Sequence, residues 1–235
     1  MHSTYLTVLK ADTKNILRDS SLVLMLIVPF AIIPIVRFGA TALFDQFPEV
    51  NEYAPMVVLM FGAMVAIFPA FVMGFVMMDE KDGGLNQVLR VLPFNLNKLI
   101  GLRVASMVFV GLANSTFFFA LNGVIFFTVA EIIIFAINVS LFAPILAFLM
   151  LCISSNKIEA AAVLKGITFV IFIAFLQFFI PSGLKYLLSP IPTFWVCRAF
   201  EEMGNWRYFA LFSTAGIVLQ LTYLLLLWKI FLRRW

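Results

Sequence analysis

Three carboxylates, Asp79, Glu80 and Asp82, lie within four residues between two long apolar segments. Carboxylate oxygens are the ligands that Mg²⁺ and Ca²⁺ prefer, so this group invites interpretation as a divalent-metal site. Such a site needs more ligands than one short segment supplies, and no second acidic set at helical spacing follows to complete the coordination sphere. We therefore expect no metal site in this chain.

Other catalytic arrangements are also missing from the sequence. His2 is the only histidine, so the apolar segments can form neither a histidine metal site nor a Ser-His or Cys-His dyad. Glu201-Glu202 with Arg207 is similar to the acidic pair of membrane glutamate proteases, but the arginine spacing differs and no later histidine exists. The phosphate-binding motif G-x-x-x-x-G-K-[ST] is absent. We expect no catalytic residues and no cofactor in this chain, which cannot use ATP on its own.

The segment after the acidic group has the pattern of a short amphipathic helix. It follows the helix-unfriendly pair Gly83-Gly84 and stops at Pro93, which cannot donate the next backbone hydrogen bond. Its apolar residues follow the i, i+3, i+4, i+7 spacing of one helical face: Leu85, Val88, Leu89 and Leu92. A helix this short is marginal in water, so its apolar face needs a partner surface. That surface is either another protein or the bilayer.

The composition identifies the setting of this helix. The chain is 63% hydrophobic and 12% charged, with a mean hydropathy of +1.07. Too little polar surface remains to cover a soluble domain of this size. The sequence therefore predicts an all-α, multi-pass membrane protein that forms a single domain over residues 1–235.

Six apolar segments are long enough at 1.5 Å per residue to cross roughly 30 Å of hydrocarbon. They cover residues 22–43, 54–78, 104–128, 132–153, 160–180 and 208–227. The first could instead be a cleavable signal peptide, because Ala40-Thr41-Ala42 resembles a cleavage site, but it is long for a signal core and Arg37 interrupts it. Arg37 is expected near the outer end of this span. The third and fourth segments are separated by little more than Glu131, so we expect a tight hairpin there.

Two regions outside the spans have patterns of their own. Residues 1–20 place apolar side chains on one helical side and cationic ones on the rest, which indicates a helix lying in the membrane interface; a frayed polar terminus is the alternative. Residues 181–207 are too apolar for a free loop and too interrupted by proline and glycine for a span. We expect a broken, re-entrant segment there.

The positions of the cationic residues predict the orientation of the chain. With the N-terminus in the cytoplasm, twelve of the sixteen Lys and Arg residues fall inside and four outside. The positive-inside rule therefore places both termini and residues 79–103 in the cytoplasm. Cys152 and Cys197 fall on opposite sides, so no disulfide is expected.

The loop at residues 79–103 resembles the cytoplasmic loop of ABC-2-type transporter permeases, the membrane halves of type V, ABCG-like exporters. The matching order is an acidic then a basic residue, a glycine, a short amphipathic helix, a proline and a basic stretch. Here these positions are Glu80-Lys81, Gly84-Leu85, Leu89, Pro93, Lys98 and Gly101-Leu102-Arg103. Leu92 departs from the pattern, because that family usually has Thr or Ser before the proline. The size and short loops are similar to those of bacterial drug exporters.

This resemblance implies partners and a site. A separate ATPase subunit, binding ATP and Mg²⁺, would receive the loop, and a second permease chain would complete a homodimer or heterodimer in the bacterial cell membrane. The residues that would couple to the ATPase are Glu80, Gly84, Leu85, Val88, Leu89 and Leu92.

The resemblance also places the second and fifth spans on the substrate path. Their stripes of soft apolar side chains suit a hydrophobic or amphiphilic cargo, a drug or lipid. The stripes consist of Met60, Met64, Phe68, Phe71 and Phe75, and of Phe172, Phe175 and Phe179. Packing against lipid and other helices is the alternative for these residues. The alternative function is that of a non-transport membrane assembly or scaffold protein that binds lipids.

Overall fold

A computed structural model describes residues 2–85, 95–180 and 183–234. Six of its helical segments are long and apolar enough to span a membrane. They cover Ser20–Gln46, Pro48–Asp82, Leu96–Leu121, Val129–Ile153, Lys157–Phe179 and Trp206–Arg233. The described residues contain no β-strand. The predicted all-α architecture with six spans is confirmed.

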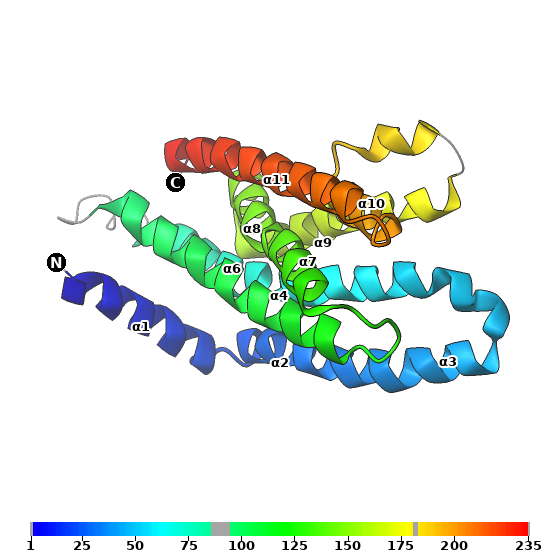
Figure 1. The fold of residues 1–235 in the computed structure, drawn as a ribbon. Coiled ribbons are helices and arrows are strands. Elements are labelled where there is room, and N and C mark those ends of the chain that lie inside the picture. The colour runs from blue at the N-terminus through cyan, green and yellow to red at the C-terminus, as the bar shows by residue number, and fades with distance from the viewer. Residues whose placement is uncertain (1, 86–94, 181–182, 235) are drawn as a thin grey trace.

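An N-terminal helix precedes the first span. Helix α1 (His2–Arg18) is followed directly by Asp19 and α2 (Ser20–Pro34). The side chain of Asp19 accepts hydrogen bonds from the backbone N–H groups of Ser21 and Leu22 and so caps α2. The first span then continues through the π-helical η1 (Ile35–Ala40) and α3 (Thr41–Gln46). Figure 1 shows both ends of the chain at the end of the bundle from which the third span starts.

Helix α4 (Ala54–Asp82) is central to the molecule. It follows the short η2 (Pro48–Tyr53) and packs against the first, third, fourth and fifth spans. Two glycines allow its close contact with α6 (Leu96–Leu121). A Cβ on Gly62 would lie 2.5 Å from Phe119 Cζ, and one on Gly111 would lie 3.1 Å from the carbonyl oxygen of Ala66. Small residues at such crossings let helix backbones approach in a membrane.

The fourth span consists of two helices, α7 (Val129–Ser140) and α8 (Phe142–Ile153). The break at Leu141 precedes Pro144, which cannot donate to the carbonyl of Ser140. The fifth span is α9 (Lys157–Ile173) continued by η3 (Ala174–Phe179). It runs antiparallel to α4, and both α9 and η3 contact it.

The broken region after the fifth span contains two short helices, η4 (Gly183–Leu188) and α10 (Pro192–Glu201). Helix α10 packs mainly against α11 (Trp206–Arg234), with further contacts to α4, α7, α9 and η3. Its two middle turns are buried, and Phe194 and Cys197 are fully enclosed. The segment is therefore interrupted by turns and packed against protein, and its re-entrant course in a membrane stays a prediction.

The predicted third span differs from the structure at both ends. It was expected to start at residue 104, but α6 already starts at Leu96, so Arg103 lies within the helix and not in the loop. The third span was expected to reach residue 128, but α6 ends at Leu121 and residues 122–128 form a non-helical connection. Asn122 Oδ1 accepts hydrogen bonds from the N–H groups of Val124 and Ile125, and Gly123 adopts a φ of 73°. Thr128 and Glu131 then start α7 with a capping box. The connection is thus longer than the predicted tight turn around Glu131.

Candidate functional site

The candidate coupling site lies at the end of the bundle where α4 ends and α6 begins, which we call the loop end. Four consecutive charged residues, 79–82, occupy the last turn of α4. Their side chains bind partners on three other helices, α6, α8 and α9, or at the termini of those helices. The last turn of α4 is therefore fixed to most of the bundle at this point.

Glu80 contributes the most buried of these contacts. Its oxygens accept from Nη1 and Nη2 of Arg103 at 2.6 and 2.5 Å. Asp12 on α1 accepts from Nε and Nη2 of the same guanidinium at 2.9 and 2.8 Å. Arg103, on α6, is only 1% exposed. One guanidinium thus joins three helices through bidentate, charge-assisted hydrogen bonds, and the group of two carboxylates and one cation has a net charge of −1.

Lys81 reaches the C-terminus of α8. Its Nζ donates to the carbonyl oxygens of Leu151 at 3.1 Å and Ser154 at 2.7 Å. The last carbonyls of a helix lack partners within the helix and carry a partial negative charge, so a lysine there is favourable. This contact ties the loop end of α4 to the end of the fourth span.

The two aspartates bind the start of α9. Asp82 Oδ2 accepts from the backbone N–H of Lys157 at 2.9 Å, and Asp79 Oδ2 pairs with Lys157 Nζ at 2.9 Å. Asp19, at the start of α2, lies 3.7 Å from the same Nζ. The hydroxyl of Ser21 lowers the pKa of Asp19, helped by backbone N–H groups and by Lys157. Asp79, Glu80 and Asp82 thus point to different cationic or N–H partners.

The predicted coupling residues lie at and beyond this cluster. Gly84 adopts a φ of 71°, a left-handed conformation that glycine takes without strain, and it ends the helical run. Leu85 is 53% exposed. Val88, Leu89 and Leu92 lie outside the described residues. The structure therefore places Glu80 in a buried ion cluster and leaves the apolar helix itself a prediction.

The residues predicted to line the substrate path lie along α4 and along the fifth span. On α4, Met60, Met64 and Phe71 are half-buried. Phe68 and Phe75 are buried, each with 9% of its surface exposed. Their rings follow one another, with centroids 6.0 Å apart for Phe68 and Phe71 and 6.3 Å for Phe71 and Phe75.

The second stripe lies on the fifth span, which contacts α4. Phe172 is half-buried, Phe175 is buried and Phe179 is exposed, and the rings of Phe172 and Phe175 are tilted to each other with centroids 5.9 Å apart. Phe179 stacks on Tyr53 at 5.4 Å, at the end of α4 opposite the loop end. At the loop end, Lys157 Nζ lies 5.9 Å from the ring of Phe75. The sequence-predicted stripes therefore belong to neighbouring, antiparallel segments.

A second ion cluster lies at the end of the bundle opposite the loop end. Arg198 on α10 pairs with Glu201 and, at 3.3 Å, with Glu202, and its guanidinium lies 4.8 Å from the ring of Phe212. Lys185 on η4 also binds Glu201 at 3.0 Å. These contacts hold η4 and α10 together against α11. The Glu201-Glu202 pair noted in the sequence is therefore part of a structural ion cluster.

Sequence reasoning missed Asp12, whose carboxylate is buried in the loop-end cluster. A signal was present, because Asp12 lies three residues after Leu9 and four before Ile16, and so falls on the apolar side of α1. An acidic residue on an apolar helical face requires a buried partner. Lys157 was also missed, and only its place at the start of a span hinted at its role.

The chain is similar to known export permeases. Residues 12–228 match the family model described as Fluoroquinolones export permease protein Rv2686c-like. Two curated proteins of Mycobacterium tuberculosis are each 24% identical over 213 residues, covering 83% of this chain and 82% of theirs. They are the fluoroquinolones export permease proteins MT2760, of strain CDC 1551 / Oshkosh, and Rv2686c, of strain ATCC 25618 / H37Rv. No solved structure matches the chain significantly.

Proposed function

The chain belongs to the Rv2686c-like family of export permeases, and from this premise we propose that it is the membrane-spanning subunit of an ATP-driven exporter, powered by a separate ATPase. The membership agrees with the resemblance to ABC-2-type permeases found in the loop sequence. The cargo we propose is a hydrophobic or amphiphilic molecule, of the drug or lipid type. Fluoroquinolones, which the relatives' names give as their cargo, are the first candidates.

The observation that carries this proposal is the ion pair between Glu80 and Arg103. The two residues flank the segment that carries the predicted coupling helix, so the base of this segment is closed by a direct contact between α4 and α6. Asp12 adds α1 to the same contact. A force applied to the segment would therefore move three helices together instead of bending a free loop.

The proposed mechanism follows from these connections. ATP-driven closure of the ATPase displaces the coupling helix, and the cluster at residues 79–82 transmits the displacement to α1, α6, α8 and α9. Helix α4 also carries the Met and Phe stripe, so the same motion changes the cargo path. The segment formed by η4 and α10, at the opposite end, is the proposed gate through which cargo leaves.

The proposed setting is the bacterial cell membrane, with both termini and the loop end in the cytoplasm. The excess of Lys and Arg on that side supports this orientation. A second permease chain is proposed to pair with the half-buried stripe of α4 and the exposed Phe179 of η3, which would enclose the path. The sequence leaves open whether that chain is a second copy or a similar protein.

Mass spectrometry of proteins that co-purify with the tagged chain tests the proposal. A P-loop ATPase is expected with the wild type. The variant Leu89→Glu places a charge in the predicted apolar face and is expected to lose the ATPase while still inserting. Gln87→Glu, on the polar side of the same predicted helix, is the matched control and should retain it. An ATPase that is absent from all three preparations would favour the lipid-binding scaffold.

A further inference from the structure

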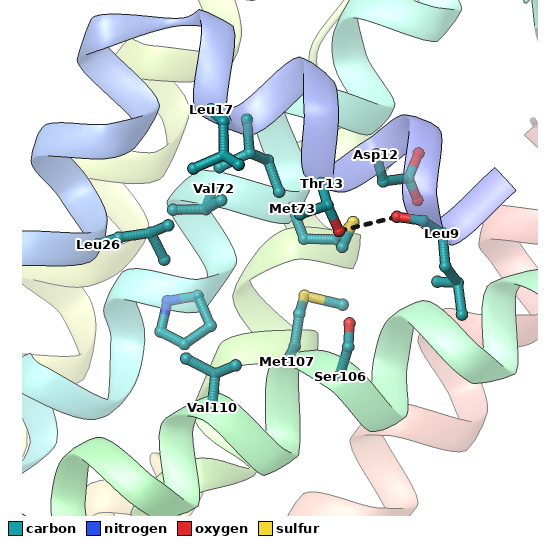
Figure 2. Close-up of a pocket in the computed structure, with 12 residues that line it drawn as sticks. Leu9, Asp12, Thr13, Leu17, Leu26, Val72, Met73, Ser106, Met107 and Val110 are labelled. Atoms are coloured by element: carbon teal, nitrogen blue, oxygen red, sulfur yellow. Dashed lines mark hydrogen bonds between the residues drawn. The ribbon is translucent and has the colours of Figure 1, made fainter. Parts of the chain in front are cut away.

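A pocket of about 380 Å³ lies between α1, α2, α4 and α6 near the loop end, apart from the predicted cargo stripes. Figure 2 shows Met73 of α4 and Met107 of α6 facing each other within it, with α1 across its top. This volume falls in the range of small-molecule sites. The lining residues are mostly apolar, and the polar ones are Asp12, Thr13 and Ser106.

All three polar lining residues present hydrogen-bond acceptors. The hydroxyl of Thr13 donates to the carbonyl of Leu9 at 2.9 Å, and that of Ser106 donates to the carbonyl of Arg103 at 2.7 Å. With their protons committed to the helices, both oxygens retain only lone pairs. The carboxylate of Asp12 is likewise an acceptor only. A ligand that meets these groups must bring N–H or O–H donors.

The net charge beside the pocket also favours a ligand with a cationic N–H donor. Asp12 and Glu80 share the single guanidinium of Arg103, so the cluster beside the pocket has a net charge of −1. The lysines of α1 nearest to the pocket, Lys10 and Lys14, are exposed and are not among its lining residues. A unit positive charge near the carboxylate is therefore favoured, most strongly where the surroundings are apolar.

We propose that this pocket binds a cationic amphiphile, an apolar or aromatic body carrying a protonated amine, with the amine at Asp12, Ser106 and Thr13. The two methionines supply a soft, polarisable surface for the body. The inference rests on the proposed function in treating this amphiphile as cargo, taken up beside the N-terminal helix. It assigns charge selection to the group formed by Asp12, Glu80 and Arg103, which also connects α1 to α4 and α6.

The test uses the purified full-length chain in phosphatidylcholine nanodiscs, without an ATPase. The probes are dansylcadaverine, which carries a primary amine, and its N-acetyl derivative, which is neutral, and binding is measured by anisotropy of the dansyl group. The amine is expected to bind at least about tenfold more tightly than the acetylated probe, as one unit charge in a partly apolar site allows. Equal affinity for the two probes would overturn the proposal.

Variants locate the binding. Leu26→Trp fills the pocket and is expected to abolish binding of the amine, while Leu24→Trp, at a position on the same helix that is 59% exposed, should leave it unchanged. Asp12→Asn should remove the preference for the amine. If Asp12→Asn fails to fold, Ser106→Val, which removes one acceptor from the proposed amine site, should weaken binding of dansylcadaverine more than binding of the acetylated probe. Wild-type affinity in Leu26→Trp would place the probe elsewhere and refute the site.

A lipid amine is the competing occupant. Nanodiscs containing phosphatidylethanolamine should leave the affinity for dansylcadaverine within about twofold, whereas loss of binding there would identify a lipid headgroup as the occupant and overturn the proposal. A chain that co-purifies with an ATPase but binds both probes equally keeps the proposed function and loses this inference. A chain that binds only the amine but recruits no ATPase keeps this binding site and loses the proposed function.

Discussion

Glu80 and Arg103 lie on either side of the segment that joins α4 to α6, and Glu80 accepts two hydrogen bonds from the Arg103 guanidinium, at 2.5 and 2.6 Å. Because the guanidinium also binds Asp12, its removal would leave the buried carboxylate of Asp12 and the half-buried one of Glu80 without their cationic partner. Uncompensated buried charge costs about 3–5 kcal/mol when one partner of an ion pair is lost. The contact is therefore important both for stability and for the connection between helices.

Arg103→Met is expected to lower the free energy of unfolding by about 3–5 kcal/mol, measured by chemical denaturation in mixed micelles. Arg207→Met is the control, because Arg207 is exposed at the start of α11, and a change below about 0.5 kcal/mol is expected there.

The triple variant Arg103→Met, Asp12→Leu, Glu80→Met separates stability from coupling. An apolar replacement of a buried ion cluster often restores stability. We expect this variant to unfold like the wild type but to export less cargo, because the directional contact between the helices is gone. Full export by a stable triple variant would show that the cluster contributes only to folding.

The sequence predicted those parts of the fold that local patterns encode. Hydropathy located six spans, whereas the assignment of the two apolar stripes to a cargo path stays a prediction. It failed at the end of the third span, because residues 124–127 are as apolar as the helix before them. The break there is made by the side chain of Asn122 and the positive φ of Gly123, which a hydropathy profile does not detect.

The candidate site was less predictable, because its contacts join distant parts of the chain. The sequence shows that residues 79–82 are charged and lie at the end of a span. It does not show that Lys81 binds carbonyls 70 and 73 positions later or that Asp82 binds the backbone of Lys157. Those pairings depend on which helices pack together, and helical periodicity constrains only the face that each helix buries.

The contact between α4 and α6 predicts a steric effect at Gly62. An added Cβ would lie 2.5 Å from Phe119 Cζ, and Phe119 is held among the rings of Phe118, Phe127 and Phe135. Gly62→Ala is expected to destabilise the protein by about 1–3 kcal/mol in thermal or chemical unfolding. Gly166→Ala, in a helical position with no atom near the added Cβ, should be neutral or stabilising by up to about 1 kcal/mol.

A rescue variant checks the cause of the Gly62 effect. Phe119→Leu removes the ring tip that the new Cβ meets, so Gly62→Ala with Phe119→Leu should be less destabilised than the sum of the two single variants. Strict additivity would mean that another contact is responsible.

The cap at Asp19 predicts a dependence on pH. The pKa of Asp19 is lowered below its ordinary value of 3.8, chiefly by the hydroxyl of Ser21. Since the folded state favours the carboxylate, this group stabilises the protein above pH 3.8, and the contribution is lost as the pH falls through the lower folded-state pKa. The difference in Tm between the wild type and Asp19→Asn should be largest near pH 6 and shrink below about pH 4. A difference that is constant with pH would assign the effect to hydrogen-bond geometry alone.

The stripe on α4 predicts a defect in export without a defect in assembly. Phe71 is half-buried between Phe68 and Phe75, so Phe71→Ala removes a large part of the proposed cargo surface while sparing the fully buried core. Apolar contacts to a substrate are worth about tenfold or more in rate. We expect Phe71→Ala to reduce the export of a fluorescent fluoroquinolone from cells by about that factor, with unchanged recovery of the co-purifying ATPase.

Phe109→Ala is the control, because Phe109 on α6 is 71% exposed and lies outside both stripes. Equal export by the two variants would assign the stripe to helix or lipid packing, and loss of the ATPase from Phe71→Ala would mean that the substitution acts through the loop end instead of on the cargo.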